Sequence, residues 1–308
     1  MTRVSTVQNY NIMTANLMKA QIRQNEVGGQ VSSQKVASDL KGYAKNAEML
    51  TAMRGTQTRI NGLVEQNKLV NNRLEMQDTG IGKIADSTKA AREAVANSLA
   101  AGNATTLMQE LRASFGNIVQ GLNTKSNGLY VFSGAKTDVA TTSATTMTDL
   151  TTAPDVTDLF HNDQYIATNR VDEQTSAKTG VLGDEMGKAV FEVFKEIQAY
   201  VDANGDFTGN LDDTQVDFLK GLLGKFDDAY KGVIDIQGKN GVTQKRFESA
   251  TTDLSNQADT LTVMVGGITD VDMADAVTRL QAAQLAVQAS AQVFSSLQQS
   301  SLLNVLRS

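Results

Sequence analysis

Three groups of polar residues in this sequence have types and spacings that could support chemistry. The first is His161, the only histidine in the chain. A zinc site or a Ser-His-Asp arrangement built on this imidazole would need partner residues that no motif in the sequence supplies. We therefore expect His161 to be a surface histidine in a loop.

The second group is the segment DANGDFTGNLDD, Asp202 to Asp213, whose first, third, fifth and ninth residues are acids or amides, as in a calcium-binding EF-hand loop. The sixth residue of such a loop is a glycine that makes the sharp turn, but here it is Phe207. The twelfth is Asp213, where an EF-hand has a bidentate glutamate. These two departures favour a solvated loop between helices over a calcium site.

The third group is the carboxylate pair Glu192 and Glu196, which would share a helix face at i and i+4. Lys188 and Lys195 lie close to them in sequence, so the four residues are typical of ordinary surface charge. The sequence contains no G-x-x-x-x-G-K-[ST] or G-x-G-x-x-G phosphate loop. It therefore predicts no catalytic residues, no cofactor and no metal ligands, and an enzyme is the weakest of the function classes considered.

The composition favours helices packed in slender bundles. Only 5% of the 308 residues are aromatic and none is Trp, so large side chains that could fill a thick globular core are few. Pro154 is the only proline, which leaves nearly the whole chain free to be helical, because proline is the strongest helix breaker. The absence of cysteine excludes disulfides and thiolate chemistry, although it does not fix the compartment.

The charge pattern argues against nucleic acid and against a membrane. The net charge is −6, and the Lys and Arg residues are scattered instead of forming a basic stripe or run. No window approaches the roughly 20 apolar residues that span a bilayer. The first thirty residues lack the apolar core of a secretory signal peptide. We expect no membrane insertion, and either a cytoplasmic chain or export without a cleaved signal peptide.

Apolar residues recur at helical spacing toward both ends of the chain, with a change in composition between them. Adjacent glycines at 28–29 and at 266–267 are expected to break the helices that contain them. The segment NGLYVFSG, residues 127–134, predicts a strand or half of a hairpin. The expected helices cover residues 6–27, 43–99, 107–122, 185 to a pause at 202–210, 214–265, and 273 to the end.

These elements predict a mainly α fold: a long coiled-coil helical bundle formed by the N- and C-terminal segments, with a small β-rich insertion domain. Helices longer than about 25 residues indicate a coiled coil. We expect residues 1–40 and 265–308 to form a terminal coiled coil, and residues 41–136 and 185–264 to form a long-helix bundle. The Thr-rich residues 137–184 would be the β or irregular insertion.

The last helix has a composition that an exposed helix normally lacks. From Gln281 to Leu306 there is no Asp, Glu, Lys or Arg, over a length of about 39 Å if the segment is helical. Its amides and hydroxyls can hydrogen-bond across an interface without the desolvation penalty of a charge, but they are costly in hydrocarbon. We therefore predict an assembly surface that sister molecules cover. The residues expected in this interface are Val7, Ile12, Met18, Leu280, Leu285, Val287, Phe294, Leu297, Leu302 and Leu306.

Both ends of the chain resemble one known family. The segments DMADAVTRLQAAQLAVQASAQVFSSLQQSSLLNVL, residues 272–306, and RVSTVQNYNIMTANLMKAQ, residues 3–21, are similar to the terminal regions of the flagellin family. Within it, SNGLYVFSGAKTD, residues 126–138, and GKNGVTQKRFES, residues 238–249, resemble the hook-associated branch that forms the hook–filament junction. The resemblance covers about three-quarters of the chain and leaves out the Thr-rich middle.

The resemblance implies three layers: terminal helices that line a tube, long helices around them, and an outer insertion. It also implies a structural protein of the bacterial flagellum, with a ring of copies joining the hook to the filament. Such a protein is exported through the flagellar type III apparatus and assembles outside the cell. Its partners would be further copies of itself, a neighbouring junction protein, flagellin, and an export chaperone that masks the C-terminal helix.

Two other functions stay open at this point. A short flagellin would build the filament itself and would form long fibres without a hook. A secreted coiled-coil adhesin would bind through residues 137–184 alone.

Overall fold

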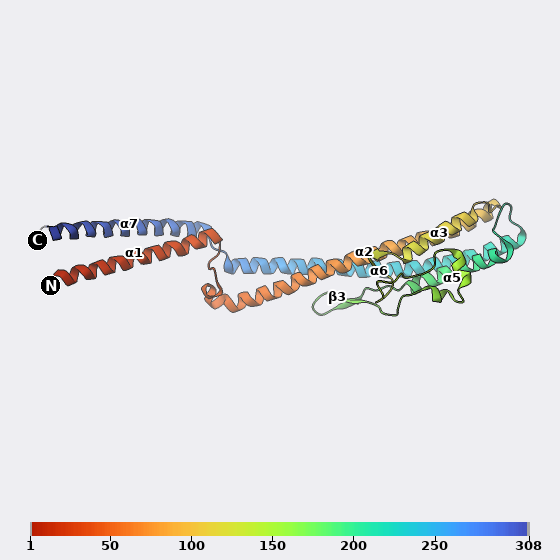
Figure 1. The fold of residues 1–308 in the computed structure, drawn as a ribbon, viewed down its shortest axis with the longest axis horizontal. Coiled ribbons are helices and arrows are strands. Elements are labelled where there is room, and N and C mark those ends of the chain that lie inside the picture. Colours follow the sequence, from red (N-terminus) through yellow and green to blue (C-terminus); the bar gives the residue numbers. More distant parts are fainter. Residues whose placement is uncertain (1, 307–308) are drawn as a thin grey trace. The chain divides into compact units, whose positions relative to one another are not determined.

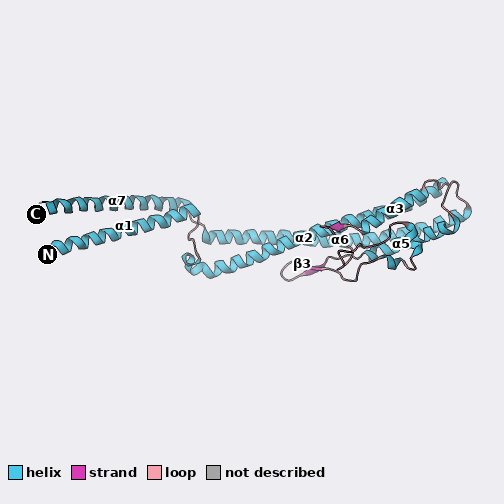
Figure 2. Cartoon of the chain, viewed as in Figure 1, coloured by secondary structure: helices cyan, strands magenta, loops and turns pink. Residues whose placement is uncertain are grey.

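The computed structural model describes the backbone of residues 2–306 and the side chains of residues 8 and 10–296. Figure 1 shows the order of the elements along the chain, and Figure 2 shows how strongly helix dominates. The elements are α1 (Thr2–Ser33), η1 (Leu40–Asn46), α2 (Ala47–Ala101), α3 (Leu107–Leu122), β1 (Lys125–Ser126), β2 (Leu129–Tyr130), α4 (Met147–Thr152), η2 (Val156–Leu159), β3 (Thr168–Arg170), β4 (Ser176–Lys178), α5 (Gly183–Asn204), α6 (Asp213–Thr269) and α7 (Met273–Leu306). The mainly α fold with a small β-containing insertion, predicted from the sequence, is confirmed.

The chain forms two compact units. Unit 1 consists of Met1–Arg59 and Gln257–Ser308, and unit 2 consists of Ile60–Asn256. The boundaries fall inside α2 and α6, so each unit contains part of both long helices. None of the described helices is long and apolar enough to cross a bilayer.

In unit 1, α1 and α7 lie side by side and run in opposite directions (Figure 1). The segments that join them to α2 and α6 are held together by a short stretch of antiparallel backbone pairing. The amide of Val36 donates to the carbonyl of Thr269 at 2.8 Å, and the amide of Val271 donates to that of Gln34 at 3.1 Å. Between these bonds, the ammonium of Lys35 pairs with the carboxylate of Asp270. The two connecting segments of unit 1 are therefore fixed to each other.

The glycine pairs do not break the helices, contrary to the sequence-based prediction. Gly28 and Gly29 lie inside α1, and Gly266 and Gly267 lie inside α6. None of the four has the positive φ that would require a glycine. The helices end a few residues later, at Ser33 and Thr269, where the paired backbone described above replaces helical hydrogen bonds. Glycine weakens a helix by only about 1 kcal/mol, which the surrounding contacts outweigh.

Unit 2 contains the main hydrophobic core, which lies between α2, α3, α5 and α6. The helices predicted over 107–122 and from 185 are present as α3 and α5, and most of their apolar residues are buried in this core. Most of the few aromatic residues of the chain meet here. The ring of Phe115 lies 5.3 Å from that of Phe191 and 5.4 Å from that of Phe194, and Phe194 lies 5.6 Å from Phe226. Most of the aromatic residues of this chain therefore lie in the core where four helices pack together.

The Thr-rich segment contains more helix than its composition predicts. Residues 147–152 form the short helix α4, which begins with a capping box between Thr146 and Asp149. That Thr-x-x-Asp spacing is a recognisable start of a helix, although no apolar stripe accompanies it. The β structure consists of two antiparallel hairpins, β1–β2 and β3–β4. The tight turn of the first is Asn127-Gly128, both with positive φ, so the predicted half-hairpin is a complete one.

One carboxylate holds the loop after β2 in place. Asp163 accepts hydrogen bonds from the amides of Ala135 and Tyr165, both at 3.0 Å. Gly134 has a φ of 68°, and a Cβ at this position would collide with the carboxylate of Asp163. The hydrogen bond from Ala135, followed by that from Tyr165, holds the pKa of Asp163 below its usual value. The bonds therefore favour the ionised form.

This lowered pKa predicts a pH dependence of stability. The contribution of Asp163 is complete above the unfolded pKa, about 3.9, and is lost as the pH falls through the lower folded pKa. We expect the urea midpoint of the Asp163→Asn variant to fall less between pH 7 and pH 3 than that of the parent chain. Asp138→Asn, at an exposed aspartate, is the matched control and should follow the parent. Equal losses in all three chains would contradict the role given to Asp163.

Candidate functional site

The residues considered for chemistry are dispersed and have structural partners. His161 is exposed, and its backbone amide donates to the carbonyl of Thr141 at 3.0 Å. In the loop that resembles an EF-hand, Asp206 pairs with Arg112 at 2.7 Å. Phe207, at the position of the required glycine, is buried and stacks on Tyr200.

The carboxylate pair on α5 is also part of the surface. Glu196 pairs with Lys225 of α6 at 2.6 Å, and Glu192 is exposed. Over the part of the chain that the structure describes, no group of three or more His, Cys, Asp or Glu residues could hold a metal ion.

Two heptad-spaced stripes form the contact between α1 and α7. On α7 the stripe consists of side chains that are buried or half-buried at alternating spacings of four and three. They are Ala276, Leu280, Ala283, Val287, Ser290 and Phe294. On α1 the facing stripe is Met13, Leu17, Ala20, Gln24 and Val27. This is the pattern of a coiled-coil seam.

Contacts at both ends of this seam show how closely the helices approach. The ring of Tyr10 lies 5.1 Å from that of Phe294. At the other end, a Cβ placed on Gly28 would lie 3.9 Å from Cδ1 of Leu280. Small residues, such as Ala20 and Ala283, occupy the middle. The two helices therefore pack along their described length through one narrow side of each.

The predicted interface residues divide between this seam and the outer surface. Leu280, Val287 and Phe294 lie in the seam, on the side of α7 that faces α1. Leu285 lies on the opposite side of α7 and is 67% exposed. Ile12 and Met18 of α1 are exposed as well. The side chains of Val7, Leu297, Leu302 and Leu306 lie outside the described residues.

The seam residues of α1 were not identified from the sequence. Ile12 and Met18, which are predicted to lie in the assembly interface, are larger and more apolar than the seam residues and lie outside the seam. The signal that would have found the correct side is the alternating spacing of three and four from Tyr10 to Val27. It was obscured because the seam contains Gln24, a polar residue, and Ala20, a small one.

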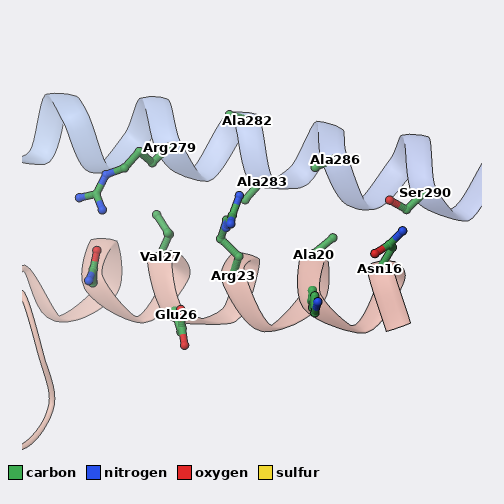
Figure 3. Close-up of a pocket in the computed structure, with 12 residues that line it drawn as sticks. Asn16, Ala20, Arg23, Glu26, Val27, Arg279, Ala282, Ala283, Ala286 and Ser290 are labelled. Atoms are coloured by element: carbon green, nitrogen blue, oxygen red, sulfur yellow. The ribbon is translucent and has the colours of Figure 1, made fainter. Parts of the chain in front are cut away.

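An open groove runs along one side of the helix pair (Figure 3). Its volume is about 670 Å³. The α7 wall consists mostly of alanines, including Ala282 and Ala286, whereas Lys19, Arg23 and Glu26 line the α1 wall. Val27 and Arg23 point toward α7 (Figure 3). The charge-free surface thus belongs to α7 alone, beyond Arg279, and α1 carries charges beside it.

Unit 1 leaves an unusual share of large apolar side chains uncovered. Among the described side chains, thirteen of the twenty large apolar residues that are exposed lie in this unit, which is little more than a third of the chain. Single exposed apolar residues are normal on a soluble protein, but a concentration of them marks an interaction surface. Together with the uncharged face of α7, these residues make unit 1 the candidate functional site.

Comparisons with known proteins find one family model that matches part of the chain. Residues 223–306 match the model of the bacterial flagellin C-terminal helical region. They include the second part of α6 and all of the described α7. None of the curated protein sequences matches the chain.

Two solved structures were compared with the chain, and the first has a similar fold. This structure, from Vibrio parahaemolyticus, has been assigned as a flagellar hook-associated protein. It is 15% identical, covers 73% of this chain and 97% of that one, and has a TM-score of 0.59. FlgL from Bacillus cereus is 17% identical, covers 65% of this chain and 98% of that one, and has a TM-score of 0.48.

Two neighbouring alanines test the packing of α1 on α7. Ala283 lies in the seam and is 3% exposed, whereas Ala282 is exposed in the groove. We expect Ala283→Asp to open the helix pair, because burying an unpaired carboxylate costs several kcal/mol. Hydrogen exchange should then lose protection in α1 and α7, and Ala282→Asp should leave it unchanged. Equal protection in both variants would contradict the seam.

Proposed function

We propose that copies of this chain assemble as a ring that joins the hook to the filament of the bacterial flagellum. The support is a match to the C-terminal helical region of the flagellin family and a fold similar to that of a hook-associated protein. The chain is a structural protein of the bacterial flagellum. One observation carries the ring proposal: unit 1 exposes a charge-free helix face together with most of the exposed large apolar side chains.

The chemistry of α7 supports burial in an assembly. Transfer of a charged side chain from water into an interface costs several kcal/mol unless a partner compensates, whereas an amide loses much less if it finds a hydrogen bond. On the side of α7 that faces away from the seam, Gln281, Gln284 and Gln288 follow one another at spacings of three and four. Leu285 lies beside them. A neighbouring copy can therefore cover this face without leaving a charge buried.

The proposed assembly interface contains residues that pack α7 against α1 within one chain and residues that contact other subunits. Leu280, Val287 and Phe294 hold α7 against α1 within one chain, and Leu285, Ile12 and Met18 contact other subunits. Val7, Leu297, Leu302 and Leu306 are proposed to extend the same interface. Residues 1–40 and 265–308 would line the tube, the long helices of 41–136 and 185–264 would surround them, and residues 137–184 would lie outermost.

The proposal includes the route and the partners of the protein. The chain is exported through the flagellar type III apparatus without a cleaved signal peptide and is located in the extracellular flagellum. A chaperone covers α7 before export, because its apolar and amide surface has no neighbour at that stage. In the flagellum the neighbours are further copies of the chain, a second junction protein and flagellin. The role is structural, and no catalysis is proposed.

Labelling of intact flagella distinguishes the proposal from its alternatives. An antibody against the chain should label one position, where hook and filament meet. Continuous decoration of the filament would show a flagellin instead. An adhesin would predict that residues 137–184 bind a target without the rest of the chain.

A matched pair of substitutions tests whether the outer face of α7 is required for assembly. We expect Leu285→Asp to leave the circular dichroism and melting temperature of the monomer unchanged, because this side chain is exposed. The variant should fail to enter flagella, because an unpaired carboxylate buried between subunits costs several kcal/mol. Ala282→Asp, at an exposed position of the same helix that lines the groove beside the charged residues of α1, is the control. Normal incorporation of Leu285→Asp would contradict the burial of this face.

A further inference from the structure

Unit 2 has two small exposed surfaces on its long helices, at nearly the same height along the bundle. The α2 surface consists of Leu69, Arg73 and Met76, which share a face at i, i+4 and i+7. The α6 surface consists of Ile234, Asp235, Gly238 and Val242, which share a face in the same way. Leu69 and Val242 are the most exposed of these apolar side chains, at 67% and 72%.

Arg73 is the unusual residue of the α2 surface. It is half-buried, and this burial lowers the pKa of its guanidinium. Among the described residues, no hydrogen bond or ion pair of its side chain is found. Arg73 is thus a partly desolvated arginine whose five N–H donors are unused, and it lies between two exposed apolar side chains. This combination is typical of a binding hot spot.

The α6 surface complements it. Asp235 is exposed, and its carboxylate likewise has no hydrogen bond or ion pair among the described residues. A Cβ at Gly238 would have no neighbour within 4 Å, so this glycine leaves open space beside Asp235. An apolar residue lies on either side along the helix, as on α2. The two surfaces therefore carry opposite charges, and in each of them the charged residue lies between two apolar residues.

The two surfaces point away from each other within one chain. On α2, Asp78 faces α6, and its carboxylate accepts a hydrogen bond from the side-chain amide of Gln237 at 3.3 Å. Leu69 lies nine residues earlier, which is two and a half helical turns and hence the opposite side. On α6, Asp235 lies two residues before Gln237, a rotation of about 200°. No intramolecular contact can join Arg73 to Asp235.

The register between the helices sets the relative height of the surfaces. The side chain of Asn240 donates to the carbonyl of Leu74 at 3.0 Å, so residues 74 and 240 lie at one level. In this antiparallel register, Leu69 of one copy can meet Val242 of a neighbour, and Met76 can meet Ile234. The shift needed is three to four residues, about 5 Å. Arg73 then lies over Gly238 and reaches Asp235.

We propose that neighbouring copies of this chain join through these surfaces, with the α2 surface of one copy against the α6 surface of the next and Arg73 paired with Asp235. A contact between two different surfaces is heterologous, and it repeats from copy to copy until a ring closes. The inference rests on the proposed function, because it supplies a lateral contact of the proposed ring. It adds to the interface of unit 1 and is independent of α7.

The absence of cysteine in the chain permits a clean cross-linking test. In full-length chains carrying Leu69→Cys and Val242→Cys, oxidation of isolated flagella should give a ladder of multimers on a non-reducing gel. The control chain carries Leu69→Cys together with Lys220→Cys. Lys220 lies on the same helix as Val242 but about 33 Å from it, so the control should stay monomeric. Equal cross-linking in the control would overturn the proposal.

Charge reversal tests the ion pair. Arg73→Asp and Asp235→Arg should each lower the yield of cross-linked multimers at least tenfold, and the two together should restore it to within twofold. Yields that the reversals leave unchanged would overturn the ion pair.

Localisation separates the two proposals. A chain that labels the hook–filament joint but gives only monomers overturns this contact and leaves the proposed function in place. A chain absent from flagella overturns the proposed function, and with it the ring to which the contact belongs.

Discussion

The antiparallel pairing of α1 with α7 is the interaction on which the rest of unit 1 depends. Two segments that lie far apart in sequence are held by one narrow seam, and its middle consists of small residues such as Ala20 and Ala283. Burial of apolar surface stabilises a protein by about 25 cal/mol for each Å². Small residues bury little such surface, so the seam by itself supplies modest stability. The backbone pairing around Lys35 and Asp270 adds to this stability, because it fixes the two helices at the end where α1 stops and α7 starts.

A narrow seam has a consequence for the surface. Each helix uses one side for its partner and leaves the others free, so apolar residues such as Ile12 and Leu285 stay exposed in a single chain. Unit 2 is built differently, since four helices surround a core that contains Phe115, Phe191 and Phe194. The chain thus combines a unit that is stable through its own core with a unit whose surface is completed by other molecules.

The sequence predicted the elements well because long helices have strong periodicity. The helices predicted over 107–122 and from 185 correspond to α3 and α5, and each buries one apolar face. The predicted breaks at the glycine pairs are wrong, because a glycine in a packed helix costs little and the true breaks depend on backbone pairing between distant segments. Such pairing has no local pattern, and neither does the side of α1 that faces α7.

The polar interruptions of the long helices have a role that periodicity alone does not reveal. Asn67 donates to the carbonyl of Val171, and Asn240 donates to that of Leu74, yet the amide oxygen of each is buried without a partner. An unsatisfied buried acceptor costs about 1–3 kcal/mol, so an apolar residue at either position would pack more stably. A buried Asn in a coiled coil specifies register at the expense of stability. We interpret Asn240 in this way, because its bond to Leu74 joins α6 to α2, and a slip of one turn would change the relative heights of Arg73 and Asp235. The register of the core therefore decides which surface residues two copies can bring together.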